Sequence, residues 1–127
     1  MKKFVFTVVA IALSFGTVTA SEINKTTVKT TIEYSKVNTF CKLITAGNYE
    51  AVKAMIENGT NINRKSMGLT PLMFAARYNK VAIVKLLIKK GAKLNSKSEK
   101  GNYTALDYAK MSKAHAAYKV LLAASKK

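Results

Sequence analysis

Apolar residues recur at helical spacing in the centre of the chain, between residues 66 and 95. Thr70 can cap a helix that starts at Pro71, because its hydroxyl accepts a backbone N–H and proline lacks a donor that the first helical position does not need. A second helix is predicted over Val81 to Lys90, where a wide apolar stripe follows the helical period. Gly91 ends that helix, since glycine readily adopts the left-handed conformation. The pattern therefore predicts two short helices packed against each other.

The same pattern occurs twice more, at a spacing of 32 to 34 residues. Upstream, six residues match residues of the central pattern that stand 32 positions later. They are Gly47, Val52, Met55, Ile56, Gly59 and Asn63, and they correspond to Asn79, Val84, Leu87, Ile88, Gly91 and Asn95. Downstream, Thr104 to Ala109 repeats Thr70 to Ala75, and a last helix is predicted over His115 to Ala124. One extra residue between Gly101 and Thr104 predicts a bulged turn there.

The two ends of the array differ from its centre, as terminal repeats must because their outer faces meet water. Asn38 is predicted to cap the first helix. The final helix is rich in alanine and closes with Ser125, Lys126 and Lys127. Both end repeats are therefore expected to act as caps.

The segments T-P-L-M-F-A-A, from Thr70, and V-K-L-L-I-K-K-G-A-K-L-N, from Val84, resemble an ankyrin repeat. The resemblance departs at Met73, where the family usually has a histidine that braces neighbouring loops, and at Asn79-Lys80, where Gly-His is usual. Methionine is expected to pack there without bracing. The resemblance implies an all-α solenoid over residues 36–127, with three helix-turn-helix repeats at about 36–64, 65–97 and 98–127. Extended turns are expected at about 62–69 and 94–103.

The N-terminal segment has the features of a secretory signal peptide. Lys2 and Lys3 precede an apolar run from Phe4 to Phe15, and small residues continue to Ala20. Residues 1–20 are therefore predicted to be removed by cleavage after Ala20, although a retained anchor helix is the alternative. Residues 21–35 are expected to form a linker or a partner-binding tail. The mature chain is expected to be periplasmic or secreted, with no transmembrane span.

The composition is strongly basic, with 22 Lys and Arg against 6 Asp and Glu and a formal charge of +16. Removal of residues 1–20, which hold two lysines and no acid, leaves +14. Cys41 is the only cysteine, so the fold must hold by packing rather than by an internal disulfide. The length suits one small domain with an adequate core.

Few side chains are suited to catalysis, since the sequence has one His, one Cys and six acidic residues. Cys41 and His115 belong to the first and third repeats, which helix packing separates by about 20 Å, too far for a nucleophile and its base. The sequence also lacks a clustered metal-ligand set. We therefore expect no enzyme activity and no cofactor. Cys41 is expected to be a half-buried apolar side chain, or alternatively a thiol that pairs with another chain.

The resemblance implies binding through the turn tips and the exposed side of each first helix. The corresponding partner-binding candidates are Ser66, Met67, Leu69, Arg77, Tyr78, Lys100, Asn102, Tyr103, Met111 and Ser112. Met67, Tyr78 and Tyr103 are expected to form one apolar patch with a basic rim, a composition typical of binding hot spots. The alternative is that these side chains pack against neighbouring turns.

The positive charge indicates an acidic protein partner, because electrostatic steering speeds the encounter of opposite charges. The alternative is a protein that binds a polyanion or an anionic membrane surface. Nucleic acid is not expected, because the basic residues lack interleaved aromatic side chains on which bases could stack. The chain is expected to be a monomer and a non-catalytic interaction module.

Overall fold

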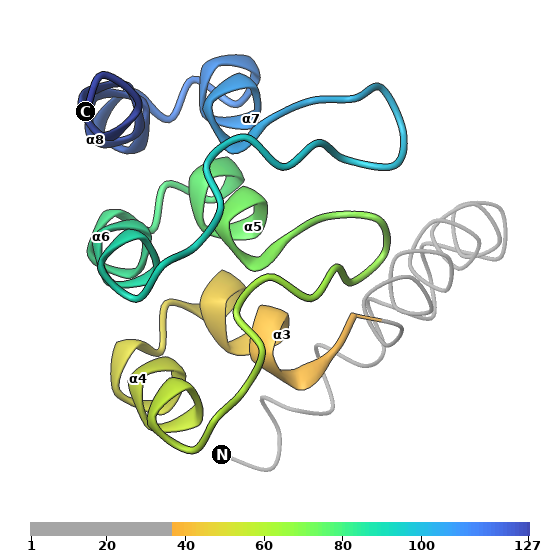
Figure 1. Cartoon of the computed structure of the whole chain (residues 1–127), viewed down its shortest axis with the longest axis vertical. Helices are drawn as coiled ribbons and strands as arrows, with labels where there is room; N and C mark the ends of the chain where they lie inside the picture. Colours follow the sequence, from red (N-terminus) through yellow and green to blue (C-terminus); the bar gives the residue numbers. More distant parts are fainter. Residues whose placement is uncertain (1–36) are drawn as a thin grey trace, which may run out of the picture. The chain divides into compact units, whose positions relative to one another are not determined.

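The computed structural model describes residues 37–127, which fold into six α-helices. They are α3 (Thr39–Ala46), α4 (Tyr49–Glu57), α5 (Pro71–Arg77), α6 (Val81–Lys89), α7 (Ala105–Met111) and α8 (His115–Ser125). Figure 1 shows α3, α5 and α7 stacked in one layer and α4, α6 and α8 in the other. The predicted all-α solenoid of three helix pairs is thus confirmed for this part of the chain. The signal peptide (1–20) and the extension (21–35) lie outside the described residues.

The first helix of each pair begins at a polar side chain that satisfies a free backbone N–H group. The side-chain oxygen of Asn38 accepts the N–H of Cys41 at 2.8 Å. The hydroxyl of Thr70 accepts the N–H of Met73 at 3.3 Å, and Pro71 follows as the first helical residue. These two predicted caps are confirmed, and they fix where α3 and α5 start.

The cap of α7 uses a carboxylate as well as a hydroxyl. Asp107 Oδ2 accepts both the N–H and the hydroxyl proton of Thr104 at 2.9 Å, while Thr104 Oγ1 accepts the N–H of Asp107 at 3.2 Å. The hydrogen bonds from Thr104 hold the pKa of Asp107 below its ordinary value, and the charges of Lys110 and Lys97 act in the same direction. Because the folded pKa is lowered, this cap contributes stability at neutral pH that is lost as the pH falls through the acidic range.

Met73 takes part in the cap of α5, which the sequence analysis did not predict. Its sulfur accepts the N–H of Thr70 at 3.3 Å, so Thr70 and Met73 cap the helix reciprocally. The sulfur is a weak acceptor, but it is fully buried and has no competition from water. This bond stays within the cap of α5, so Met73 serves its own helix and not the neighbouring loops.

Two hairpin loops project from the layer of α3, α5 and α7 (Figure 1). In the first loop, the Ser66 N–H donates to the Leu69 carbonyl at 2.8 Å and the Leu69 N–H donates back at 3.1 Å. In the second, the Ser98 N–H donates to the Tyr103 carbonyl at 2.8 Å, and the Ser98 hydroxyl accepts the Tyr103 N–H at 3.0 Å.

The second loop is longer than the first by two residues, because four residues separate Ser98 from Tyr103 and two separate Ser66 from Leu69. The extra residue expected between Gly101 and Thr104 is one of the two, and the other, which was not predicted, lies between Ser98 and Gly101. The loop opens at Ser98, well before Gly101, and the Ser98 side chain replaces one backbone hydrogen bond of the narrower hairpin.

The hydrophobic core lies between the two layers. Its largest side chains with almost no exposed surface are Ile44, Leu72, Met73, Ile83, Leu87 and Leu121. Cys41 also belongs to the core, with 0% of its surface exposed, so the expectation of a half-buried side chain was wrong. Its small apolar side chain lies on the inward face of α3, where the solvent does not reach. A thiol buried to this extent cannot meet a thiol of another folded chain.

Hydrogen bonds of polar groups tie each repeat to the next. The side-chain oxygen of Asn63 accepts the N–H of Lys93 at 2.9 Å, and that of Asn79 accepts the N–H of Ala117 at 3.1 Å. On the loop side, the N–H of Asn38 donates to the Ser66 hydroxyl at 2.9 Å. These bonds fix the stacking register, because each joins groups that belong to neighbouring repeats.

Gly101 occupies a position in the second hairpin loop that alanine cannot enter without strain. Its φ is +82°, and a Cβ atom there would lie 2.3 Å from Cε2 of Tyr103. We expect Gly101→Ala to lower the free energy of unfolding by about 2 kcal/mol, because the left-handed conformation and the overlap with the ring both add cost. Urea denaturation followed by circular dichroism measures this loss.

Gly91→Ala is the matched control, because it measures the cost of the left-handed backbone conformation without an overlap with a neighbouring ring. Gly91 has a φ of +93°, but no atom lies within 4 Å of the position that its Cβ would occupy. This variant should lose only about 1 kcal/mol, the cost of the left-handed conformation alone. Equal losses in the two variants would contradict a close packing of Tyr103 on Gly101.

Candidate functional site

The exposed large apolar side chains of residues 37–127 gather on one layer of the solenoid. They are Met67, Tyr78, Tyr103 and Met111, which are 54%, 46%, 42% and 52% exposed. Met67 and Tyr103 lie on the two hairpin loops, Tyr78 directly follows α5, and Met111 is the last residue of α7. We refer to these loops and helix ends as the inner surface, comprising Met67, Leu69, Arg77, Tyr78, Lys100, Asn102, Tyr103, Met111 and Ser112.

The loop part of the inner surface is held together across two repeats. The N–H of Glu99 donates to the carbonyl of Gly68 at 3.0 Å, which joins the tips of the two hairpins. Tyr103 meets the ring of Tyr108 edge to face, with centroids 5.8 Å apart. Tyr103 therefore has the structural contact that the alternative interpretation anticipated, yet it keeps a large exposed area for a partner.

The remaining loop candidates differ in exposure. Met67, Lys100 and Asn102 are exposed, and Leu69, which closes the first hairpin, is half-buried. Ser66 is buried at 7% exposure, and its hydroxyl accepts the N–H of Asn38. Ser66 therefore joins two repeats and has no free surface to offer a partner, so we leave it out of the inner surface.

The helix-end part of the inner surface comes from α5 and α7. The guanidinium carbon of Arg77 lies 5.7 Å from the ring centroid of Tyr78, within the range of a cation–π interaction. Met111 and Ser112 occupy the same repeat positions on α7, and all four side chains are exposed. Because packed helices lie about 8–10 Å apart, these four side chains form one group at the ends of α5 and α7. Arg77 gives this group a positive charge, and Tyr78 and Met111 give it apolar surface.

The structure separates Tyr78 from Met67 and Tyr103. The residues that flank α5, Thr70 and Tyr78, are about 12 Å apart, since an α-helix rises 1.5 Å per residue. Met67 and Tyr103 lie at the end of α5 that Thr70 caps, whereas Tyr78 lies at the other end. The expected single patch is therefore two groups, one at each end of the same pair of helices.

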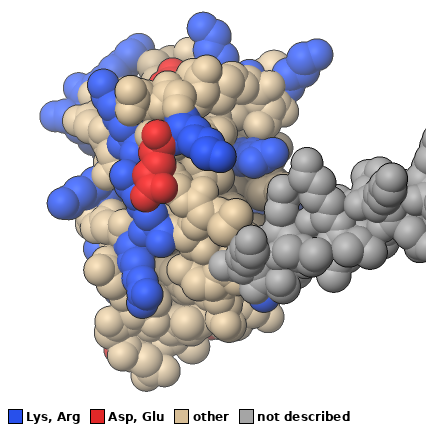
Figure 2. Space-filling model, turned by 90° about the vertical axis from the view of Figure 1, so that its right-hand side faces the viewer, with Lys and Arg blue, Asp and Glu red and all other residues tan. Residues whose placement is uncertain are grey.

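Basic side chains predominate around the inner surface. Figure 2 shows the face toward which the loops project, where Lys and Arg side chains surround a small acidic group. The acidic residues of the part of the chain that the structure describes are Glu50, Glu57, Glu99 and Asp107. This face therefore presents apolar groups within a mainly positive field.

The buried thiol and the histidine do not form a catalytic pair. Burial raises the pKa of the Cys41 thiol to about 12, so the thiolate is scarce at neutral pH. His115 is exposed at the start of α8, in the third helix pair, while Cys41 lies on α3 in the first.

Among residues 37–127, no group of three or more His, Cys, Asp or Glu side chains could hold a metal ion. The helices of this region also lack the length and apolar content needed to cross a membrane.

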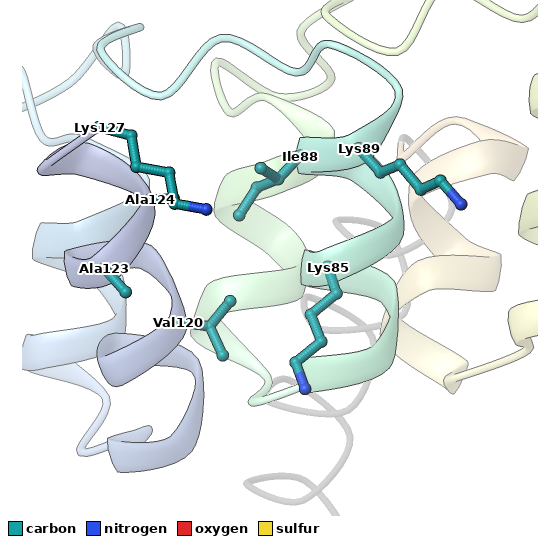
Figure 3. Close-up of a pocket in the computed structure, with 7 residues that line it drawn as sticks. All are labelled: Lys85, Ile88, Lys89, Val120, Ala123, Ala124 and Lys127. Carbon is teal, nitrogen blue, oxygen red and sulfur yellow. The ribbon is translucent and has the colours of Figure 1, made fainter.

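A groove between α6 and α8 was missed by the sequence analysis. It is lined by Ile88, Val120, Ala123 and Ala124, with lysines at its edges (Figure 3). A signal was nonetheless present, because the segments 58–98 and 108–127 contain no Asp or Glu.

The sequence relatives of this chain are ankyrin repeat proteins. A predicted ankyrin repeat protein of Acanthamoeba polyphaga mimivirus is 41% identical over 54 residues, which cover 39% of this chain and 13% of the relative. A second one, from Fowlpox virus, is 46% identical over 55 residues, covering 42% of this chain and 11% of the relative. The ankyrin repeat, SAM and basic leucine zipper domain-containing protein 1 of Equus caballus is 33% identical over 66 residues, 51% of this chain and 14% of the relative.

The similarity thus reaches only a small part of each of these relatives, at most 14% of their length. The match to the family itself is broader, since residues 39–127 fit the model of ankyrin repeats in three copies. This range contains all six helices and both hairpin loops. Ankyrin repeats generally mediate protein–protein interaction and are typically non-catalytic. The chain therefore belongs to the ankyrin repeat family.

Proposed function

We propose that this chain is a non-catalytic module that binds an acidic protein through its inner surface, in an exported compartment. The observation that carries the proposal is the placement of Met67, Tyr78, Tyr103 and Met111. These exposed side chains share the layer of the loops and of α5 and α7. Large flexible and aromatic side chains of this kind contribute most of the binding energy in many interfaces.

The charge of the chain supports an acidic partner. With 22 basic and 6 acidic residues, the chain attracts negatively charged surfaces and repels further copies of itself. Arg77 combines this charge with the ring of Tyr78, and such a pair can meet a carboxylate and an apolar group together. The apolar groups would then provide most of the affinity, and the basic groups would speed association.

Export is the second part of the proposal, and it rests on residues 1–20. A basic start, an apolar run and small residues up to Ala20 are the features that a signal peptidase recognises. N-terminal sequencing of the protein recovered from its native host would give Ser21 as the first residue if cleavage occurs as proposed. Recovery with Lys2 and Lys3 still attached would contradict it.

The binding function is tested by affinity capture from the exported fraction of the native host. We expect the unmodified protein to recover one acidic protein in stoichiometric yield. The double variant Arg77→Glu with Tyr78→Ala should reduce this recovery at least about tenfold, because it reverses a charge and removes an aromatic contact at the helix ends.

Lys53→Glu is the matched control, since it makes the same reversal of charge at an exposed position of α4. Equal recovery by the double variant and the unmodified protein would contradict the proposed surface. Retention on heparin or anionic vesicles that is lost at moderate salt, without any protein partner, would instead identify a polyanion-binding protein.

A further inference from the structure

A groove of about 350 Å³ runs between α6 and α8, on the layer opposite to the inner surface. Its floor is apolar and consists of Ile88 from α6 and of Val120, Ala123 and Ala124 from α8. Figure 3 shows Lys85 beside the floor and the amino group of Lys127 turned toward Ile88, while Lys89 extends away from α8. The groove is therefore an apolar strip with two lysines on α6 and a third, Lys127, just beyond the end of α8.

Two departures from the repeat pattern shape the strip, one in side-chain length and one in charge. Ala123 and Ala124 of α8 stand at the repeat positions that Lys89 and Lys90 occupy at the end of α6. Their short side chains cannot reach over the neighbouring helix, whereas lysine stems commonly cover apolar surface. In α4, Glu57 stands at the position of Lys89, so the acidic group of the first repeat is replaced by a basic one. The ends of α6 and α8 therefore carry lysine on one helix and alanine on the other, with no carboxylate on either.

The charge around the groove has one sign. Neither α6 nor α8 contains an acidic residue, and none occurs in the segments 58–98 and 108–127. Lys85 and Lys89 are one helical turn apart on α6, so their charges lie on neighbouring positions of the same helix. A ligand that fills the strip must therefore accept positive charge along its edges.

We propose that this groove binds an acidic amphipathic helix of a protein partner. A helix can insert apolar side chains at positions i, i+3, i+4 and i+7 between α6 and α8, while its acidic flanks meet Lys85 and Lys127. An anionic bilayer would also attract these lysines, so vesicles are included as a competitor in the test below. A polyanion without apolar groups would leave the floor uncovered, and a second copy of this chain would bring a like charge. This site lies apart from the inner surface and is independent of the proposed function.

The experiment uses a fluorescently labelled peptide of about 18 residues, with leucines at the spacing given above and glutamates on both flanks. Fluorescence anisotropy with the purified protein measures its Kd. We expect saturable binding that weakens at least about tenfold in Ala123→Glu, because the new carboxylate fills the floor and repels the glutamates. Ala123 is exposed, so this change should leave the fold intact, as circular dichroism can verify.

Ala54→Glu on α4 is the matched control, since it introduces the same side chain at an exposed helical position outside the groove. This variant, and the inner-surface variant Arg77→Glu with Tyr78→Ala, should bind the peptide as the unmodified protein does. Unchanged binding by Ala123→Glu would overturn the proposal. Equal binding of a scrambled peptide of the same composition, or its displacement by phosphatidylglycerol vesicles, would also overturn it, because either result means attraction by charge alone.

Discussion

Replacing Leu87 with alanine is expected to lower the free energy of unfolding by about 3 kcal/mol. Leu87 is fully buried on α6, and this helix packs against α4, α5 and α8. The shorter side chain would leave a cavity at the junction of all three repeats. A domain of this size is stable by roughly 5–15 kcal/mol, so the change would remove a large share of the total. Urea denaturation monitored by circular dichroism measures the loss.

Lys85→Ala serves as the control for this prediction, because Lys85 lies on the same helix but is exposed. Its free energy of unfolding should stay within about 0.5 kcal/mol of the unmodified protein. A similar small loss for Leu87→Ala would mean that α6 is not the packed centre of the array. A loss that is confined to one part of a biphasic transition would show that the repeats unfold separately.

Alkylation of Cys41 should be about 1,000-fold slower in the folded protein than in urea. Burial raises the pKa of the thiol from 9.0 to about 12, which reduces the reactive thiolate by this factor at about pH 8. The absence of exposed surface hinders the reagent further. Reaction with iodoacetamide, quenched over time and quantified by mass spectrometry, measures both rates. Comparable rates would show that α3 opens readily and that Cys41 is accessible after all.

The raised pKa of Cys41 also affects stability in alkali. Above about pH 9 the unfolded chain loses the thiol proton while the folded chain retains it, so unfolding becomes more favourable until about pH 12. The same group therefore contributes its full stability only below about pH 9. Cys41→Ala lacks this titration, and its stability should fall less steeply over this range. Lysine deprotonation is common to both proteins and cancels in the comparison.

The sequence was sufficient to predict the helices and the caps at Asn38 and Thr70, because those features depend on local chemistry. Thr70, Pro71 and Gly91 act within one or two turns of their own positions, so their roles follow from residue type and spacing. The spacing of 32 to 34 residues then predicted how the helix pairs stack, since each repeat must bury its apolar face on the next.

Features that depend on distances between repeats were beyond such reasoning. The depth of Cys41 depends on how closely α3 meets its neighbours, and the separation of Tyr78 from Tyr103 depends on the direction of α5. The function of Ser66 as a link to Asn38 joins residues that are 28 positions apart. The groove likewise arises from the side-by-side placement of α6 and α8, although the missing acidic residues marked its charge.

The asparagine bonds between repeats bear on how such a chain could lengthen by internal duplication. Each junction has one of them, Asn63 with Lys93 at the first and Asn79 with Ala117 at the second. The middle repeat holds Asn79, and it also holds Asn95 at the position that Asn63 has in the first repeat. A tandem copy of residues 65–97 would therefore meet its original through both bonds. The middle repeat therefore has both asparagines that a duplicated copy needs for these hydrogen bonds. The first repeat lacks one of them, because Gly47 stands in place of Asn79.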